Sequence, residues 1–212
     1  KNGLCNAAPN PMVGAVIVCD GRIIGEGYHI RCGEAHAEVN AIRSVKDESL
    51  LKRSTIYVSL EPCSHYGKTP PCADLIIEKQ IPRIVIGCQD PFSQVAGRGI
   101  QKLKDAGREV IVGVLESECR QLIRRFITFN TLHRPYITLK WAESADHFID
   151  LERTDGQPVV LSSPLTSMLV HKRRAESVAI MVGRRTALLD NPSLTVRNWY
   201  GRNPIRVRSE EH

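Results

Sequence analysis

The sequence predicts an α/β protein with a mixed sheet, followed by a second and smaller α/β unit. Apolar segments of strand length alternate with helical segments between residues 36 and 130, as in strands joined by crossover helices. A hairpin precedes this alternation, so one strand pair is expected to be antiparallel. Around residues 133–135 the pattern stops and a new one begins.

The first two predicted strands cover residues 13–18 and 22–27, and Asp20-Gly21 between them predicts a tight hairpin turn. The alternation then predicts a helix at 36–46, a strand at 55–59, a helix at 71–80, a strand at 83–87, a helix at 99–106, a strand at 109–112 and a long helix from 117 to about 130. Ligand sites in such sheets lie where strand ends meet loops and helix N-termini. We therefore expect the site near residues 36 and 63.

The second unit begins after His133-Arg134, because Pro135 disfavours helix at the residue before it. A strand is predicted at 136–140, a helix at 164–175 and a strand at 178–182, followed by a turn-rich stretch with Asp190-Asn191-Pro192. These elements predict two domains, residues 1–132 and 133–212. We expect the first to lack part of its N-terminus, since the chain begins at Lys1, and the second to be incomplete at its C-terminus.

The distribution of charge and the spacing of the cysteines indicate which partners and which cellular compartment to expect. The net charge is +6, with three of the excess basic groups before residue 133 and three after it. A nucleic-acid binder would concentrate this charge, so phosphorylated small molecules are the expected partners. The seven cysteines are irregularly spaced, which predicts reduced thiols and a cytoplasmic protein. No apolar run is long enough for a membrane span, and no secretory signal opens the chain.

Four residues carry the chemistry that the sequence predicts. His36, Cys63 and Cys72 supply one imidazole and two thiolates, which suit Zn²⁺ and leave a fourth position for water. Glu38 stands two residues from His36, where its carboxylate can move protons between that water and a leaving amine. This pattern predicts hydrolytic deamination of a nucleobase-like ring.

Two other interpretations of the same residues stay open. A lone His-x-Glu pair is more often an accident of a helix surface than a metal site. The complete order, with Pro62-Cys63 after a strand and Cys72 at a helix start, is much more specific. A zinc-stabilised binding module without catalysis would normally have four protein ligands, and only three are evident.

Five segments resemble the RibD family, the bifunctional deaminase-reductases of bacterial riboflavin biosynthesis. They are Pro-Asn-Pro-Met-Val-Gly at 9–14, Gly-Glu-Ala-His-Ala-Glu at 33–38, Leu-Glu-Pro-Cys-Ser-His-Tyr-Gly-Lys-Thr-Pro-Pro-Cys at 60–72, Val-Ala-Gly-Arg-Gly at 95–99 and Arg-Pro-Tyr-Ile-Thr-Leu-Lys-Trp-Ala at 134–142. Eight residues separate the two cysteines, whereas many cytidine- and adenosine-type deaminases have two there.

The resemblance implies a cytidine-deaminase-like three-layer domain and a partial domain similar to dihydrofolate reductase. The first would deaminate 2,5-diamino-6-ribosylamino-4(3H)-pyrimidinone 5′-phosphate with zinc, and the second would reduce the ribosyl group with NADPH. A homo-oligomer is also implied. The positions that would bind the deaminase substrate are Asn10, His29, His65, Lys68 and Asp90. Asn10 could instead be a turn former, His29 a surface histidine and Asp90 a turn cap.

In the second unit the resemblance places the cofactor at Lys140, Ala142, Gly183 and Thr186, and the reductase substrate at Arg174, Asn191 and Arg197. Two residues depart from the family pattern: Asn191 replaces an aspartate, and His147 replaces a glycine suited to positive φ. A deaminase of another pyrimidine, nucleobase or RNA, with an inactive C-terminal domain, is the alternative. An RNA enzyme would need an open groove at the insert between the cysteines.

Overall fold

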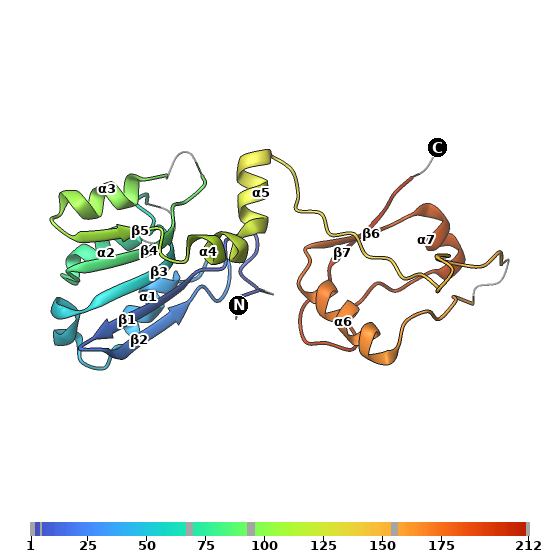
Figure 1. Ribbon diagram of the computed structural model, residues 1–212, viewed down its shortest axis with the longest axis horizontal. Helices are drawn as coiled ribbons and strands as arrows, with labels where there is room; N and C mark the ends of the chain where they lie inside the picture. The colour runs from blue at the N-terminus through green and yellow to red at the C-terminus, as the bar shows by residue number, and fades with distance from the viewer. Residues whose placement is uncertain (1–2, 5, 67–69, 93–95, 154–156, 211–212) are drawn as a thin grey trace. The chain divides into compact units, whose positions relative to one another are not determined.

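The computed structural model describes residues 3–4, 6–66, 70–92, 96–153 and 157–210 (Figure 1). The chain divides into two compact units, Lys1–Tyr136 and Ile137–His212. No helix among these residues has the length and apolar character needed to cross a bilayer.

A five-stranded mixed sheet forms the centre of the first unit (Figure 1). Its strand order is β2-β1-β3-β4-β5, and β1 pairs antiparallel with both β2 and β3, whereas β3, β4 and β5 run parallel. The strands are β1(Gly14–Cys19), β2(Arg22–Tyr28), β3(Thr55–Leu60), β4(Arg83–Cys88) and β5(Glu109–Val112). The parallel strands end at one edge of the sheet, where Cys63 and Asp90 follow β3 and β4.

The hairpin between β1 and β2 turns through Asp20 and Gly21, whose φ angles are +51° and +74°. Two successive residues with positive φ fit the twist of a two-residue hairpin. This confirms the turn that the sequence predicted.

Helices cover both faces of the sheet, which gives three layers. On one face α1(Ala37–Arg43) packs so closely on β2 that a Cβ at Gly27 would lie 2.3 Å from the backbone nitrogen of Ala41. On the other face α4(Glu116–Leu122) approaches β4, where a Cβ at Gly87 would lie 2.3 Å from Sγ of Cys119. The remaining helices of this unit are α2(Cys72–Glu78), α3(Arg98–Asp105), α5(Arg124–Leu132) and the 3-10 helix η1(Glu48–Arg53).

The main hydrophobic core lies between one face of the sheet and the helices α1, α2 and α3. Every second residue of the central strands points into this core. Ile17, Ile56 and Ile84 stand side by side on β1, β3 and β4 and are fully buried. Fully burying one such side chain contributes about 1.5–3 kcal/mol to stability. This core fixes the strand ends from which the site residues project.

One prediction for the first unit is wrong in detail, and one element was not predicted. The long helix predicted at 117–130 is two helices, α4 and α5, which meet at Ile123. Ile123 has φ −104° and ψ +17°, and its buried side chain packs with Leu60 and Cys88. Burial of this side chain therefore outweighs the continuation of one straight helix. The short helix η1 was not predicted.

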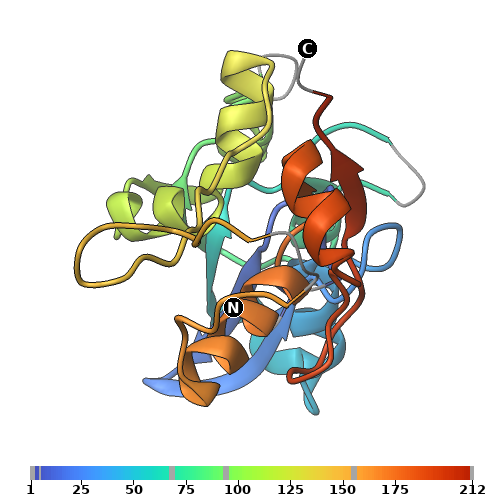
Figure 2. The same cartoon turned by 90° about the vertical axis from the view of Figure 1, so that its right-hand side faces the viewer.

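The second unit contains α6(Pro164–Ala175), β6(Ala179–Val182), α7(Arg184–Asp190) and β7(Ile205–Arg208). β6 and β7 pair in parallel, and α7 and β7 were not predicted. The strand predicted at 136–140 is wrong, because residues 137–153 and 157–163 form neither helix nor strand (Figure 2). Ile137 and Leu139 are 64% and 77% exposed, and no strand among the described residues pairs with this segment.

Candidate active site

Within the described residues, three side chains that could hold a metal ion converge: His36, Cys63 and Cys72. Their ligand atoms all lie within 4.8 Å of one another. Nδ1 of His36 is 3.5 Å from Sγ of Cys63 and 3.3 Å from Sγ of Cys72. The structure thus brings together the three residues that the sequence predicted as zinc ligands.

Each of the three residues comes from a different element end. His36 immediately precedes α1, Cys63 follows β3, and Cys72 is the first residue of α2. The backbone N–H of Cys72 donates to Sγ of Cys63 at 3.3 Å, and the N–H of Ala73 donates to the Cys63 carbonyl at 3.1 Å. The start of α2 therefore holds the two cysteines together.

Two side chains hold the backbone immediately before His36 by hydrogen bonds to the carbonyl oxygen of Ala35. This oxygen accepts from Nδ1 of His29 at 3.1 Å and from Nδ2 of Asn40 at 3.3 Å. A carbonyl can only accept, so Nδ1 of His29 carries a proton. Nε2 of His29 lies 3.2 Å from Nδ2 of Asn10. His29 is only 2% exposed, so it is not a surface histidine.

The pKa values of the two cysteines are shifted in opposite directions. Hydrogen bonds from the Cys72 thiol and from His36 lower the pKa of Cys63 to about 4, although burial opposes this shift. The pKa of Cys72 is raised because its thiol donates to Cys63 and because it is buried. The hydrogen bond to Cys63 also raises the pKa of His36, against its partial burial. The lowered pKa of Cys63 favours its thiolate, the form that binds metals.

Glu38 lies in the first turn of α1 and is 3% exposed. Burial raises the pKa of its carboxyl group from 4.5 to about 7, and the negative charge of Cys63 adds to this effect. A backbone hydrogen bond partly opposes the rise. A carboxyl group with a pKa near neutrality can both take up and release a proton at physiological pH.

A cavity of about 270 Å³ opens beside the cluster. It is lined by Asn10, Pro11, Val13, His29, His36, Glu38, Leu60, Glu61, Cys63, His65, Asp90, Phe92 and Phe126. The cavity thus collects four of the five predicted substrate residues of the first unit. The fifth, Lys68, lies outside the described residues.

Asp90 combines the two roles that the sequence left open. Its Oδ1 accepts from the N–H of Phe92 at 2.9 Å, which is a turn cap, and its side chain also lines the cavity. Burial raises the pKa of Asp90, and the charges of Glu61 and Cys63 add to this, whereas the Phe92 hydrogen bond and His65 oppose it.

Six residues of the cavity wall were not predicted as site residues: Pro11, Val13, Leu60, Glu61, Phe92 and Phe126. Glu61 belongs to the Leu-Glu-Pro-Cys segment, so its position next to the ligand Cys63 was the available signal. Phe126 lies on α5, about 60 residues after Cys63 in the sequence. Nothing in its local sequence indicates that it lines the cavity.

The predicted residues of the second unit are only partly brought together. Arg174 on α6 donates from Nη1 to the carbonyl of Thr195 at 3.0 Å, and Arg197 donates to the hydroxyl of the same threonine at 3.2 Å. Nε of Arg174 is buried without a hydrogen-bond partner among the described residues. Its burial and the charge of Arg197 lower the pKa of Arg174.

A second cavity, of about 260 Å³, is lined by Val182, Ala187, Asn191, Pro192, Leu194, Arg206, Val207 and Arg208. Of the residues predicted for the reductase half, this wall contains Asn191. Gly183 and Thr186 lie at the start of the neighbouring α7, and Lys140 and Ala142 belong to the segment without helix or strand.

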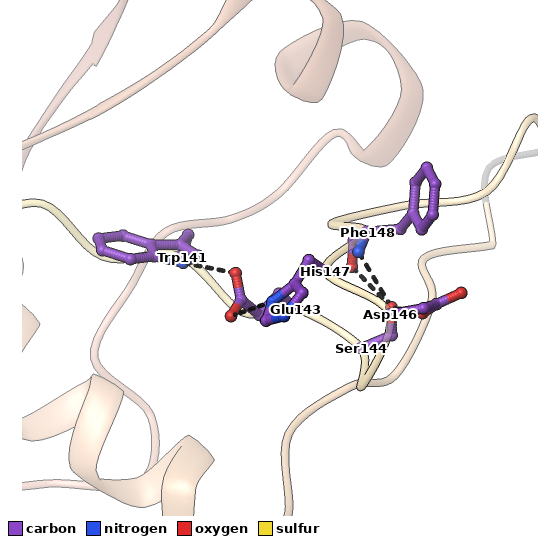
Figure 3. Close-up of polar contacts among 6 residues, drawn as sticks. All are labelled: Trp141, Glu143, Ser144, Asp146, His147 and Phe148. Carbon is purple, nitrogen blue, oxygen red and sulfur yellow. Dashed lines mark hydrogen bonds and ion pairs between the residues drawn. The ribbon is translucent and has the colours of Figure 1, made fainter.

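His147 has the positive φ that its family position implies, +67°. Its Nδ1 lies 3.0 Å from Oε1 of Glu143, and Oε2 of Glu143 accepts from Nε1 of Trp141 at 3.1 Å (Figure 3). The hydroxyl of Ser144 bonds to the backbone of Phe148 on the other side of this turn. These contacts surround a residue in the left-handed region, which costs about 1–2 kcal/mol for a side chain other than glycine.

The chain matches two family models. Residues 2–88 match the cytidine and deoxycytidylate deaminase zinc-binding region, and residues 135–208 match the RibD C-terminal domain. The riboflavin biosynthesis protein RibD of Aquifex aeolicus is 46% identical over 189 residues, which cover 89% of this chain and 52% of that protein. The chain belongs to the RibD family. RibD of Escherichia coli is 45% identical over 197 residues, which cover 93% of this chain and 53% of that protein.

Solved RibD structures have the same fold. A diaminohydroxyphosphoribosylaminopyrimidine deaminase/5-amino-6-(5-phosphoribosylamino)uracil reductase from Thermotoga maritima gives a TM-score of 0.89 at 47% identity, over 98% of this chain and 58% of that one. RibD from Acinetobacter baumannii gives 0.89 at 38% identity, over 98% and 59%. The predicted fold class is therefore confirmed. The chain spans about half the length of the curated RibD relatives that it matches.

Proposed function

We propose that the first unit hydrolytically deaminates 2,5-diamino-6-ribosylamino-4(3H)-pyrimidinone 5′-phosphate in riboflavin biosynthesis. The observation that carries this proposal is the convergence of His36, Cys63 and Cys72 beside a cavity that the buried carboxyl group of Glu38 also lines. The name of the Thermotoga maritima relative supplies the substrate class. We assign residues 1–132 to the deaminase domain and residues 133–212 to part of the reductase domain.

The donor set fits zinc. One imidazole nitrogen and two sulfurs lie within 4.8 Å of one another, and the lowered pKa of Cys63 favours its thiolate. Structural zinc sites normally have four protein ligands, whereas three-ligand sites keep a position for substrate or water. His36, Cys63 and Cys72 would hold the ion. When bound, zinc acts as a Lewis acid that makes water a nucleophile at neutral pH.

The chain's own residues would then handle the protons and the ring. Deamination adds the oxygen of water to the carbon that bears the amino group, and the carbon–nitrogen bond breaks as ammonia leaves. Glu38 would take the proton released by water and deliver it to the departing nitrogen, which its pKa of about 7 allows. The apolar wall formed by Val13, Leu60 and Phe126 would limit access of bulk water.

Polar residues around the cavity would bind the substrate. Asn10 and His29 form a hydrogen-bonded pair on one wall, and His65 and Asp90 line the same cavity. We assign these four to the substrate, together with Lys68, which the family resemblance places at the phosphate. The substrate is a phosphorylated small molecule, and the cavity of about 270 Å³ suits one pyrimidine ring.

For the second unit we propose NADPH-dependent reduction of the ribosyl group, completed by further parts of a full-length RibD protein. Arg206 and Arg208 line the cavity beside Asn191 and supply positive charge suited to a phosphorylated nucleotide. Lys140, Ala142, Gly183 and Thr186 stay predicted cofactor residues. Nε of Arg174, which has no hydrogen-bond partner in the described part of the chain, fits an anionic group, so Arg174, Asn191 and Arg197 stay predicted substrate residues. A homo-oligomer and a cytoplasmic location also stay predictions.

One experiment tests both halves. The purified chain, with zinc content measured, is incubated with the diaminopyrimidinone ribosyl phosphate while ammonia release and NADPH absorbance are followed together. Ammonia release supports the deaminase, and NADPH oxidation that follows it supports the reductase. Glu38→Gln should keep zinc and lose deamination by a factor of at least ~10², the lower range for a positioned proton-transfer group. Ammonia from cytidine or deoxycytidylate alone would overturn the proposed substrate.

A further inference from the structure

Glu61 is a buried carboxylate that the chemistry above does not use. It follows β3 directly, two residues before Cys63, and is 4% exposed. Its own backbone N–H donates to the carbonyl of Cys88 at 2.9 Å, which continues the pairing of β3 with β4. An isolated buried carboxylate is costly, so its partners indicate why it is there.

Among the described residues, the hydrogen bonds to this carboxylate come from four backbone amides of one segment. Oε2 accepts from Asp90 at 3.2 Å and from Gly97 at 2.9 Å. Oε1 accepts from Gly99 at 2.9 Å and from Ile100 at 3.2 Å. One side chain thus joins the end of β3 to both ends of the connection between β4 and α3.

The backbone of this connection is shaped to reach Glu61. Gly97 has φ +79°, a conformation that glycine adopts without strain. A Cβ at Gly99 would lie 2.0 Å from the carbonyl oxygen of Pro62, so only glycine allows this approach. The close approach of Gly99 to Pro62 and the four hydrogen bonds to Glu61 therefore depend on the same backbone conformation.

The same connection carries part of the cavity wall. Asp90 and Phe92 both line the cavity, and Asp90 caps the turn that leads to Phe92. The metal-ligand side is held separately, because Cys63 bonds to the first residues of α2 through its Sγ and its carbonyl. Loss of the Glu61 carboxylate should loosen the Asp90 wall while the ligand cluster keeps its support.

We propose that Glu61 is a positioning residue that fixes the Asp90–Phe92 wall relative to the metal ligands and thereby sets substrate affinity. This inference rests on the proposed function for its kinetic part. Glu61→Gln tests it, because the amide NH₂ group cannot accept and would face two N–H donors. The variant should keep one zinc per chain, change kcat little, and raise KM about tenfold, because buried N–H groups left without an acceptor cost free energy and loosen the wall.

Hydrogen exchange provides a readout that does not depend on the substrate. Peptides covering residues 89–101 should exchange faster in Glu61→Gln, whereas peptides covering 70–79 should be unchanged. The matched control is Asp47→Asn, which removes an exposed carboxylate that caps η1 through Ser49. It should affect exchange only around residues 47–53 and leave KM unchanged.

A double variant tests whether Glu61 acts through Asp90. If it does, Glu61→Gln combined with Asp90→Asn should raise KM by less than the product of the two single effects. Multiplicative effects, an unchanged KM, or loss of zinc and kcat at constant KM would overturn the proposal.

If the wild type releases no ammonia from the proposed substrate, the proposed function fails, and the exchange comparison still decides the role of Glu61. If Glu61→Gln does not fold, hydrogen exchange of the wild type is the test. Fast exchange of the backbone amides at residues 90, 97, 99 and 100 would overturn the proposal.

Discussion

Replacing Glu38 by glutamine should stabilise the metal-free protein at neutral pH while it abolishes activity. The carboxyl group is buried inside α1, and this burial raises its pKa from 4.5 to about 7. Below pH 4.5 the group is protonated in both the folded and the unfolded chain, so it costs nothing. Above pH 4.5 the unfolded chain loses the proton first, and the folded state becomes progressively less stable until the pH passes about 7.

The size of this effect follows from the two pKa values. They differ by about 2.5, and each pKa unit corresponds to about 1.36 kcal/mol, which gives ~3 kcal/mol at pH 8. A glutamine at position 38 is neutral at every pH and avoids this penalty. The stability difference between Glu38→Gln and the wild type should therefore be larger at pH 8 than at pH 4.5 by roughly that amount.

Urea unfolding of EDTA-treated protein at several pH values measures the difference. Glu34→Gln is the matched control, because Glu34 is an exposed carboxylate near the same helix. Zinc should reduce the gain for Glu38→Gln, since a nearby cation favours the ionised carboxylate. A difference that is constant with pH, or that falls as the pH rises, would refute the reasoning.

Two further predictions concern the metal and the packing of α1. Cys63→Ala should lose the bound zinc measured by mass spectrometry of metals, whereas Cys32→Ala, at an exposed thiol, should keep it; retained zinc in the first variant would contradict the ligand assignment. Gly27→Ala places a Cβ 2.3 Å from the nitrogen of Ala41 and should lower the melting temperature and the activity together. Gly14→Ala, whose added Cβ has its nearest neighbour at 4.0 Å, should do neither, and equal effects of both would argue against close packing of α1 on β2.

The first unit could be predicted well because its signals are local. Strands β1 to β5 are short apolar runs bounded by turn residues, and Asp20-Gly21 marks the hairpin directly. The ligand cluster could be predicted because the required residue types stand at element ends, which the alternation places at one edge of the sheet. The boundary between α4 and α5 could not, because it depends on the burial of Ile123 against Leu60 and Cys88.

The second unit was predicted less well for a related reason. A strand is stable only when it pairs, and the apolar run at 136–140 has no ladder partner in the part of the chain that the structure describes. β7 does pair, but with β6 about 26 residues earlier, and a parallel pairing at that distance leaves no mark in the local sequence. Helix α7 lies between Gly183 and Asn191, residues that also suit turns, so the turn prediction at 190–192 concealed it.

Glu38 and Glu61 show how two buried side chains of the same residue type can have different roles. Both are nearly inaccessible to solvent and both line one cavity. Glu61 meets four backbone amides, so its charge is compensated by rigid groups and its oxygens are occupied. Glu38 has less compensation, and its pKa near 7 leaves it able to exchange a proton. The partners of each carboxylate therefore support the proposed proton transfer by Glu38 and the proposed positioning by Glu61, a distinction that residue type and spacing alone could not make.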